Sequence, residues 1–256
     1  MSRGLLNLGN TCYFNTAVQC LAHVPSLTNR FLRDGPYEGN CAVTREYSVL
    51  VRHMWNKRHQ GDPIAPRELL REFQTKCPHF SPGYQHDTHE AVLALLDILE
   101  ESLGLTYMKP LFYGTEEQTV TYPKGTSWGA GTFATLFVRN PEHLVNYSKH
   151  QIIEGYEDND GNRHHVAALE TKVTETGHCL LVNFTEKTTV DQVPDTYLGM
   201  HLFAFVIHWG MLHGGHYAAL LKHKKQWRLV DDDSVRDVDE PDKGTPCSMA
   251  WYKKMV

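Results

Sequence analysis

Near the start of the chain, residues 4–15 read GLLNLGNTCYFN. The two glycines of this stretch relieve backbone crowding, so the pattern predicts a loop that tightens and then turns into a helix. Asn10 or Thr11 would cap that helix, and apolar residues recur behind it at a spacing of three and four. The sequence therefore predicts that Cys12 lies at or next to the N-terminus of a helix.

This position matters for the chemistry of the thiol. Unpaired N–H groups and the helix dipole favour an anion, so we expect Cys12 to ionise more easily than a free cysteine. A single buried cysteine more often only packs in a core. Cys12 is therefore a candidate nucleophile only if another part of the chain supplies a base for its thiol.

Size and composition are those of an ordinary globular protein. The chain has 256 residues, of which 41% are apolar and 21% charged, enough for one large domain or two small ones. A net charge of −5 gives no reason to expect nucleic acid as a partner. No apolar run approaches the ~20 residues of a membrane span, and the start lacks the apolar segment of a signal peptide. The six cysteines form no C-x-x-C pair, which predicts reduced thiols in an intracellular protein, cytoplasmic or nuclear.

Two further motifs accompany the first. Residues 84–90 read YQHDTHE, and residues 214–218 read GGHYA, followed by WRLVDDD at 227–233. The three motifs occur in the order found in the ubiquitin-specific proteases, a family of papain-like cysteine deubiquitinases, which the chain resembles over nearly its whole length. The resemblance implies an α+β, papain-like fold and a single catalytic domain over residues 1–256. Within it we expect a helical thumb (1–105), reduced β fingers (106–178) and a β palm (179–256).

The resemblance also implies a reaction, hydrolysis of the (iso)peptide bond after the C-terminal glycine of ubiquitin or a ubiquitin-like modifier. Cys12 would attack the carbonyl carbon, and His216 would hold the proton and deliver it to the leaving lysine. Asp231 would orient His216, with Asp232 as a second acidic candidate. Asn7, five residues before the nucleophile, matches the side chain that stabilises the oxyanion in the family, although by residue type alone it is an ordinary turn asparagine.

A further group of residues would line the channel for the C-terminal tail of ubiquitin: Gln85, Asp87, Gly214, Gly215 and Tyr217. Asp87 also begins a capping-box pattern with Glu90, ahead of apolar residues with helical spacing. Capping is the first role expected of Asp87, and its carboxylate could also pair with arginines of the tail. The expected partner is ubiquitin or a ubiquitin-conjugated protein, and the expected state is a monomer.

The choice among the three aspartates at 231–233 follows from strand pairing. A hairpin that places Lys222 opposite Trp227 around an even-length loop would continue its pairing through the aspartates. Because side chains alternate between faces, Asp231 then lies diagonally from His216 on the same face, whereas Asp232 projects from the other. Asp231 is the predicted orienter, and a β-bulge would promote Asp232 instead.

The helical rhythm is lost from residue 107 to 177, where β-rich segments predict the fingers. In the family this region often holds zinc on two C-x-x-C pairs. Here Tyr122 and Gly125 stand where the first pair would fall, and Val166 and Leu169 stand near the second. We therefore expect short fingers without a metal, and a protein without a cofactor.

Three other functions stay open at this point. A serine hydrolase could use Ser127, Asp191 and His216, since residues around Ser127 fit G-x-S-x-G, but the glycines that follow are a poor start for the required helix. A metalloprotease could use His86 and His89, although their order fits neither H-E-x-x-H nor H-x-x-E-H. A catalytically weak relative that only binds ubiquitin is the third.

Overall fold

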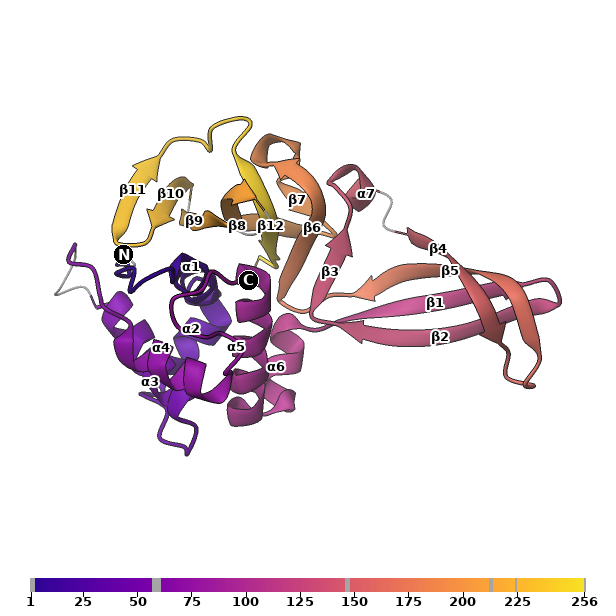
Figure 1. Ribbon diagram of the computed structural model, residues 1–256, viewed down its shortest axis with the longest axis horizontal. Coiled ribbons are helices and arrows are strands. Elements are labelled where there is room, and N and C mark those ends of the chain that lie inside the picture. Colours follow the sequence, from indigo (N-terminus) through magenta and orange to yellow (C-terminus); the bar gives the residue numbers. More distant parts are fainter. Residues whose placement is uncertain (1–2, 57–60, 146–147, 212–213, 224, 256) are drawn as a thin grey trace.

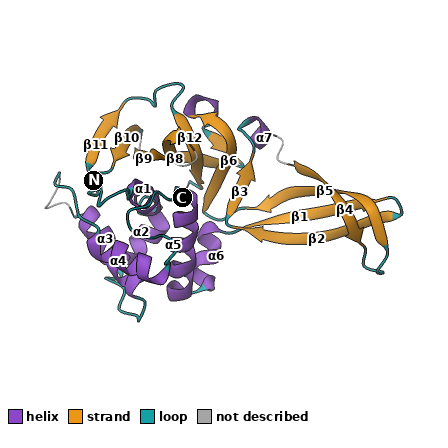
Figure 2. Cartoon of the chain, viewed as in Figure 1, coloured by secondary structure: helices purple, strands orange, loops and turns teal. Residues whose placement is uncertain are grey.

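Figures 1 and 2 show the computed structural model, which describes residues 3–56, 61–145, 148–211, 214–223 and 225–255. Helices gather at one end of the molecule, and an eight-stranded sheet covers them. A four-stranded sheet projects away from both as a long arm. The α+β class expected from the sequence is confirmed.

The helical part contains six helices within the described residues. They are α1 (Cys12–Leu21), α2 (Pro25–Arg33), α3 (Ala42–Met54), α4 (Arg67–Lys76), α5 (Thr88–Leu103) and α6 (Leu105–Phe112). The last of these was not predicted, because Gly104 and Pro110 read as breaks. Helix α6 forms nevertheless, since Met108, Leu111 and Phe112 are buried in the same core as the other helices.

Helix α1 is the centre of this core, and all ten of its residues are buried. It lies between the other helices and the eight-stranded sheet (Figure 1). Two of its polar side chains bind the segment that precedes it: Asn15 Nδ2 donates to the carbonyl oxygen of Leu5 at 3.2 Å, and Gln19 Nε2 donates to that of Arg3 at 2.7 Å. Burying these two amides is tolerated because both donate hydrogen bonds, and these bonds hold the N-terminal segment in place.

The eight-stranded sheet has the order β11-β10-β9-β8-β12-β6-β3, with β7 paired to β8. Its strands are β3 (Thr135–Val138), β6 (Cys179–Thr189), β7 (Thr196–Tyr197), β8 (Met200–Met211), β9 (Gly214–His223), β10 (Gln226–Asp231), β11 (Ser234–Val238) and β12 (Pro246–Lys253). Along β8, Ala204 and Val206 face the helical core, whereas Phe205 and Ile207 belong to a second core on the opposite face. The central part of the sheet is therefore buried on both faces, whereas the edge strand β11 is largely exposed.

The arm is a four-stranded sheet with the order β2-β1-β5-β4. It comprises β1 (Gly114–Tyr122), β2 (Gly125–Phe133), β4 (Ser148–Glu157) and β5 (Arg163–Glu175), and the short helix α7 (Glu142–Val145) precedes β4. At its tip the rings of Tyr122 and His164 are in contact, with centroids 4.4 Å apart and planes tilted by 36°, and His164 Nε2 lies 2.8 Å from Asp158 Oδ2. An aromatic and charged contact thus lies where the family often holds zinc, and the absence of a metal stays a prediction.

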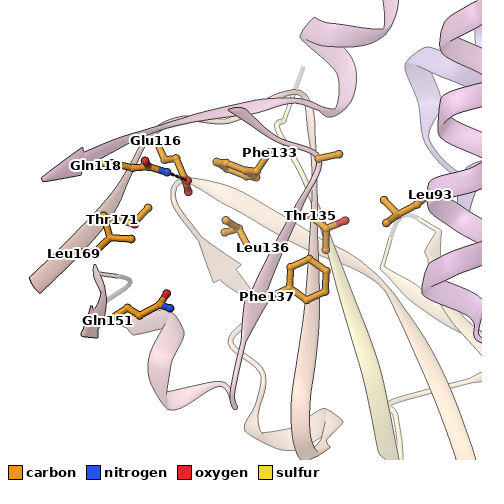
Figure 3. A pocket seen from close by; sticks show the side chains of 11 residues that line it. Leu93, Glu116, Gln118, Phe133, Thr135, Leu136, Phe137, Gln151, Leu169 and Thr171 are labelled. Carbon is orange, nitrogen blue, oxygen red and sulfur yellow. Dashed lines mark hydrogen bonds between the residues drawn. The ribbon is translucent and has the colours of Figure 1, made fainter. Parts of the chain in front are cut away.

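Where the arm meets the rest of the molecule, there is an open pocket of about 430 Å³ (Figure 3). Leu93 of α5 lies on one side, Thr135 and Phe137 of β3 form a second wall, and Gln118 and Thr171 come from the arm. The hollow is therefore built from three separate parts of the fold.

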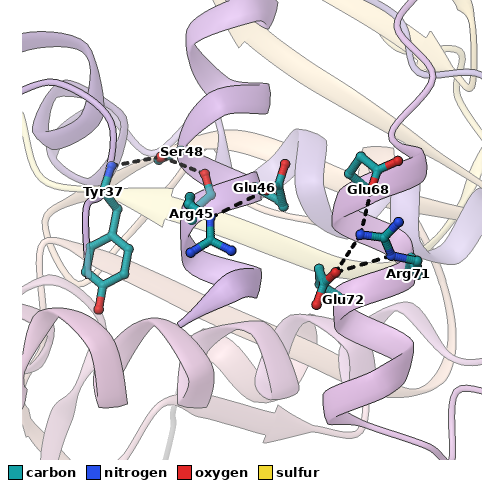
Figure 4. Close-up of polar contacts among 7 residues, drawn as sticks. All are labelled: Tyr37, Arg45, Glu46, Ser48, Glu68, Arg71 and Glu72. Atoms are coloured by element: carbon teal, nitrogen blue, oxygen red, sulfur yellow. Dashed lines mark hydrogen bonds and ion pairs between the residues drawn. The ribbon is translucent and has the colours of Figure 1, made fainter. Parts of the chain in front are cut away.

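The outer surface of the helices is charged. In Figure 4, Arg71 pairs with Glu68 and Glu72, each at 2.7 Å, and Arg45 lies near Glu46. Exposed pairs of this kind contribute at most about 1 kcal/mol each. The packing of α3 on α4 therefore depends on their apolar faces. Among the described residues, no helix combines the length and apolar character needed to span a membrane.

Candidate active site

Cys12 is the first residue of α1, as predicted, and is only 4% exposed. The backbone N–H of Tyr217, on β9, faces its sulfur. Because α1 packs against β9, the nucleophile candidate and the strand that carries His216 lie together.

The expectation that the thiol ionises easily is wrong for this environment. Burial is the largest influence and raises the pKa of Cys12, and the negative charge of Asp232 raises it further. The N–H groups of Tyr217, Tyr13 and Cys12 itself act in the opposite direction without outweighing burial. The helix N-terminus is present, but the thiol needs a partner to accept its proton.

The loop before Cys12 is held by Asn7. Its Oδ1 accepts the backbone N–H of Gly9 at 3.0 Å and that of Thr11 at 3.2 Å. Thr11 occupies the N-cap position, but its side chain does not cap α1, and the hydroxyl accepts the N–H of Leu8 at 2.9 Å instead. The side-chain amide of Asn10 donates to the carbonyl oxygen of Gly83 at 2.8 Å. The predicted capping by Asn10 or Thr11 is therefore wrong, although the position of the helix start is right.

The β9–β10 hairpin has the predicted register. Trp227 lies opposite Lys222. His216 Nε2 lies 2.5 Å from Asp231 Oδ1, which is the diagonal contact that this register predicts. With Nε2 bound to the carboxylate, Nδ1 is the ring nitrogen that remains to exchange a proton with a thiol.

Pairing does not continue through the three aspartates, contrary to the prediction. Asp231 is the last residue of β10 and pairs with Ser234, so Asp232 and Asp233 form the turn into β11. Asp232 has a φ of 49°, a left-handed conformation that aspartate tolerates in turns. Two consecutive aspartates between the β-rich segments 227–231 and 234–238 could have indicated this turn from the sequence.

Asp232 ties this turn to the loop and helix of Cys12. Its Oδ2 accepts from Asn7 Nδ2 at 2.7 Å, and its Oδ1 accepts from Asn15 Nδ2 at 2.8 Å. Its carbonyl oxygen accepts the N–H of Leu5 at 2.8 Å. The role could not be read from the sequence, because the partners are more than 200 residues away.

The same cluster has the composition of a metal site. Ligand atoms of His216, Asp231 and Asp232 lie within 4.8 Å of one another. His216 and Asp231 are bonded to each other, and both carboxylate oxygens of Asp232 accept hydrogen bonds from asparagine amides. The groups are satisfied within the protein, so nothing in their bonding calls for an ion.

A second set of contacts joins the segment before α5 to β9. The N–H of Gly215 donates to Gln85 Oε1 at 2.8 Å, and the hydroxyl of Tyr217 donates to Asp87 Oδ2 at 2.9 Å. The other oxygen of Asp87 accepts the N–H of Glu90 at 3.1 Å, which confirms the predicted N-cap of α5. Gly214 is exposed beside Gln85. Four predicted channel residues are thus brought into direct contact, and Gly214 adjoins them.

Two glycines, Gly210 and Gly215, determine how closely strands β8 and β9 approach each other. Gly210 has a φ of 143° and lies opposite Gly215, where a side chain would collide with backbone atoms of Gly214 and Gly215. A side chain on Gly215 would meet the ring of His208, which stacks on Tyr217 with centroids 4.3 Å apart. Close approach of the two strands requires glycine at both positions.

The serine-hydrolase alternative is wrong on structural grounds. Ser127 lies inside the continuous strand β2 of the arm, and its Oγ is 2.6 Å from the hydroxyl of Tyr156. The G-x-S-x-G motif requires a strand, a sharp turn and a helix. Asp191 lies in a short 3-10 helix (Val190–Gln192) and accepts the N–H of Gly244 at 2.8 Å.

The metalloprotease alternative also fails. His86 precedes α5 and lies 3.1 Å from the carbonyl oxygen of Ser81. His89, within α5, is buried and lies 3.3 Å from Thr135 Oγ1. The two histidines therefore do not share one face of a helix.

Comparisons with known proteins agree with this architecture. The profile of the family described as "Ubiquitin carboxyl-terminal hydrolase" matches residues 3–252. The chain is 37% identical over 115 residues to ubiquitin carboxyl-terminal hydrolase 5 of Arabidopsis thaliana, and 34% identical over 116 residues to ubiquitin carboxyl-terminal hydrolase 15 of Xenopus tropicalis. Each match covers 42% of this chain and only 12% of the relative's length.

The fold is similar to that of a solved structure described as the SAGA Ubp8/Sgf11/Sus1/Sgf73 DUB module bound to ubiquitin aldehyde. The TM-score is 0.79 at 14% identity, and the match covers 99% of this chain and 70% of the other. This likeness confirms the expected papain-like α+β fold. Since the family profile spans almost the whole sequence, the chain belongs to the ubiquitin carboxyl-terminal hydrolase family.

Proposed function

We propose that the chain is a thiol-dependent deubiquitinase that hydrolyses the (iso)peptide bond after the C-terminal glycine of ubiquitin or a ubiquitin-like modifier. One observation carries the proposal. Helix α1 places Cys12 against β9, and the His216 of that strand is bonded to Asp231. A nucleophile, its base and the orienter of the base therefore come from three separate elements.

In the proposed reaction, Nδ1 of His216 accepts the proton of Cys12, and the thiolate attacks the carbonyl carbon of the terminal glycine. The resulting tetrahedral intermediate collapses as His216 returns the proton to the leaving lysine amine, which leaves a thioester on Cys12. A water molecule then attacks the thioester, with His216 accepting its proton and returning it to the sulfur. Asp231 stabilises the imidazolium in each half of the reaction.

The oxyanion would form beside the N-terminus of α1. An asparagine amide carries two N–H bonds, and Asn7 directs one of them at Asp232. The second can donate to the oxyanion, together with backbone N–H groups at the start of α1. The hydrogen bonds that Oδ1 of Asn7 accepts hold the amide in this orientation.

The channel for the modifier's tail would run between the segment before α5 and β9. Gly214 and Gly215 offer backbone without side chains, so an extended peptide can approach closely. Gln85 is bonded to the N–H of Gly215, which a tail carbonyl could take over as it enters. Both oxygens of Asp87 already accept hydrogen bonds, so any arginine of the tail would share this carboxylate with Tyr217.

We also propose a thumb, fingers and palm within one catalytic domain, with one change from the sequence-based division. Helix α6 shares the core of the other helices, so the thumb would end at Phe112 rather than at residue 105. Ubiquitin or a ubiquitin-conjugated protein would be the partner, bound by a monomer.

Turnover of ubiquitin carrying a fluorogenic amide at its C-terminus tests the proposal. Cys12→Ala should abolish hydrolysis at unchanged Tm, whereas Cys41→Ala, which changes a partly exposed cysteine at the start of α3, should leave it intact. Hydrolysis that survives Cys12→Ala would contradict the proposal. Ubiquitin binding by a wild-type chain that shows no hydrolysis would instead identify a binding relative.

A further inference from the structure

A partly exposed tryptophan lies over the imidazole of His216. Trp209 is directly opposite His216 in the β8–β9 ladder. Their ring planes differ by 10°, and the ring centroids are 6.1 Å apart, an offset stacked arrangement. Trp209 is not among the residues that the family resemblance implicates in catalysis or in binding.

Trp209 does not belong to either hydrophobic core of the described chain. It is 37% exposed, whereas Trp227 and Trp251 are buried in the two cores. Its indole thus stacks, offset, beside one face of His216 and stays partly exposed to solvent. The ring contact that this indole makes among the described residues is the one with His216.

The geometry of His216 leaves one motion unrestrained. The ring is attached at Cβ, and its Nε2 is bonded to Asp231, so the imidazole can still rotate about the line that joins these two points. An aromatic plane stacked on one face opposes rotation of the imidazole out of that plane. The ring face of an indole also attracts a cation, so the stack favours the protonated imidazole that forms when Cys12 gives up its proton.

Other groups around the imidazole are charged or ionisable. Asp231 and Asp232 approach from the end of β10, and Cys12 lies on α1, which packs against the strand of His216. Trp209 is the residue that adds an aromatic face from β8. The ring is therefore held at its edge by a carboxylate and on its face by an indole.

We propose that Trp209 is a positioning residue that holds His216 toward Cys12 and favours the thiolate–imidazolium pair. The proposal rests on the function proposed above. It adds to that function a residue on β8, which acts through His216 and does not need to touch the substrate.

The test compares Trp209→Ala, Trp209→Phe and Trp128→Ala. Trp128 is a matched control, since it is 78% exposed on β2 of the arm. Two rates are measured: hydrolysis of the ubiquitin amide, and alkylation of Cys12 by iodoacetamide, which requires no ubiquitin. Trp209→Ala should lower kcat and the alkylation rate at pH 7 by about three- to tenfold, with KM changed less than about twofold. Trp209→Phe should recover much of the loss, and Trp128→Ala should show none.

The pH dependence separates positioning from damage to the fold. A base matters less when the thiol ionises in bulk alkali, so the difference in alkylation between wild type and Trp209→Ala should narrow toward about pH 10. A change confined to KM would overturn the proposal and identify Trp209 as a substrate contact, and an equal loss at both pH values would also overturn it. If the wild type does not hydrolyse ubiquitin but its Cys12 alkylation still depends on Trp209, the proposed function fails and the positioning role stands.

Discussion

Replacing Asp231 and Asp232 separately by alanine should produce two different defects. Asp231 contacts His216 at a partly exposed position, and such a pair contributes about 0–1 kcal/mol to stability. Asp232 accepts hydrogen bonds from two asparagine amides that belong to the loop and helix of Cys12. Bonds to a charged acceptor are worth about 1.5–3 kcal/mol each, so we expect a loss of about 2–4 kcal/mol after allowing for partial exposure.

For a chain of this size about 1 kcal/mol corresponds to roughly 2 °C in Tm. Asp232→Ala should therefore lower Tm by about 4–8 °C, and Asp231→Ala by less than about 2 °C. Catalysis should show the reverse order. Asp231→Ala removes the orienter of the base and should lower kcat by about 10²–10⁴-fold. Asp232→Ala should cost much less when both variants are assayed well below their Tm.

Differential scanning calorimetry and steady-state kinetics on the same preparations measure both quantities, with Asp233→Ala as the control from the same turn. Equal Tm losses for Asp231→Ala and Asp232→Ala would refute the claim that the hydrogen bonds of Asp232 stabilise the fold. A larger kcat loss for Asp232→Ala than for Asp231→Ala would refute the assignment of the orienter.

Three further predictions concern other parts of the fold. Asn7→Ala should lower kcat by up to about 10²–10³-fold with a smaller change in KM, and an unchanged kcat would leave Asn7 as a turn residue only. Gly210→Ala should lower Tm and activity together, because its φ of 143° and the facing backbone exclude a side chain, whereas Gly129→Ala on the open surface of β2 should be neutral or stabilising in the same thermal melts. The hydrogen bond from His164 lowers the pKa of Asp158 to about 2, below the roughly 3.9 of an unfolded aspartate. The ionised Asp158 therefore stabilises the fold fully above about pH 4, and this stabilisation is lost as pH falls through about 2. The Tm difference between wild type and Asp158→Asn should accordingly be present at about pH 5 and vanish toward pH 2, and a difference that persists at pH 2 would count against this bond.

Local patterns predicted the parts of the site that depend on local physics. Asp87 and Glu90 identified the start of α5, because capping requires only neighbours in sequence. Alternation along two strands was enough to choose Asp231 over Asp232 as the contact of His216, because the loop between the strands is short and even.

Long-range burial explains what sequence reasoning missed. The pKa of Cys12 is raised because the surrounding fold excludes water from the thiol, which a helix N-terminus alone does not reveal. Helix α6 forms around Pro110 because its apolar residues complete a core made by distant helices. The hydrogen bonds that Asp232 accepts from Asn7 and Asn15 join segments more than 200 residues apart, so no local motif indicates them.

The most direct test of the central claim is the site of covalent capture by ubiquitin with a C-terminal electrophile. Intact-mass analysis of the treated protein should show one added ubiquitin, and peptide mapping should place it on Cys12. His216→Ala should slow this capture strongly, whereas Ser127→Ala should leave it unchanged. Capture on another residue, or capture that proceeds equally well in Cys12→Ala, would contradict the assignment of Cys12 as the nucleophile.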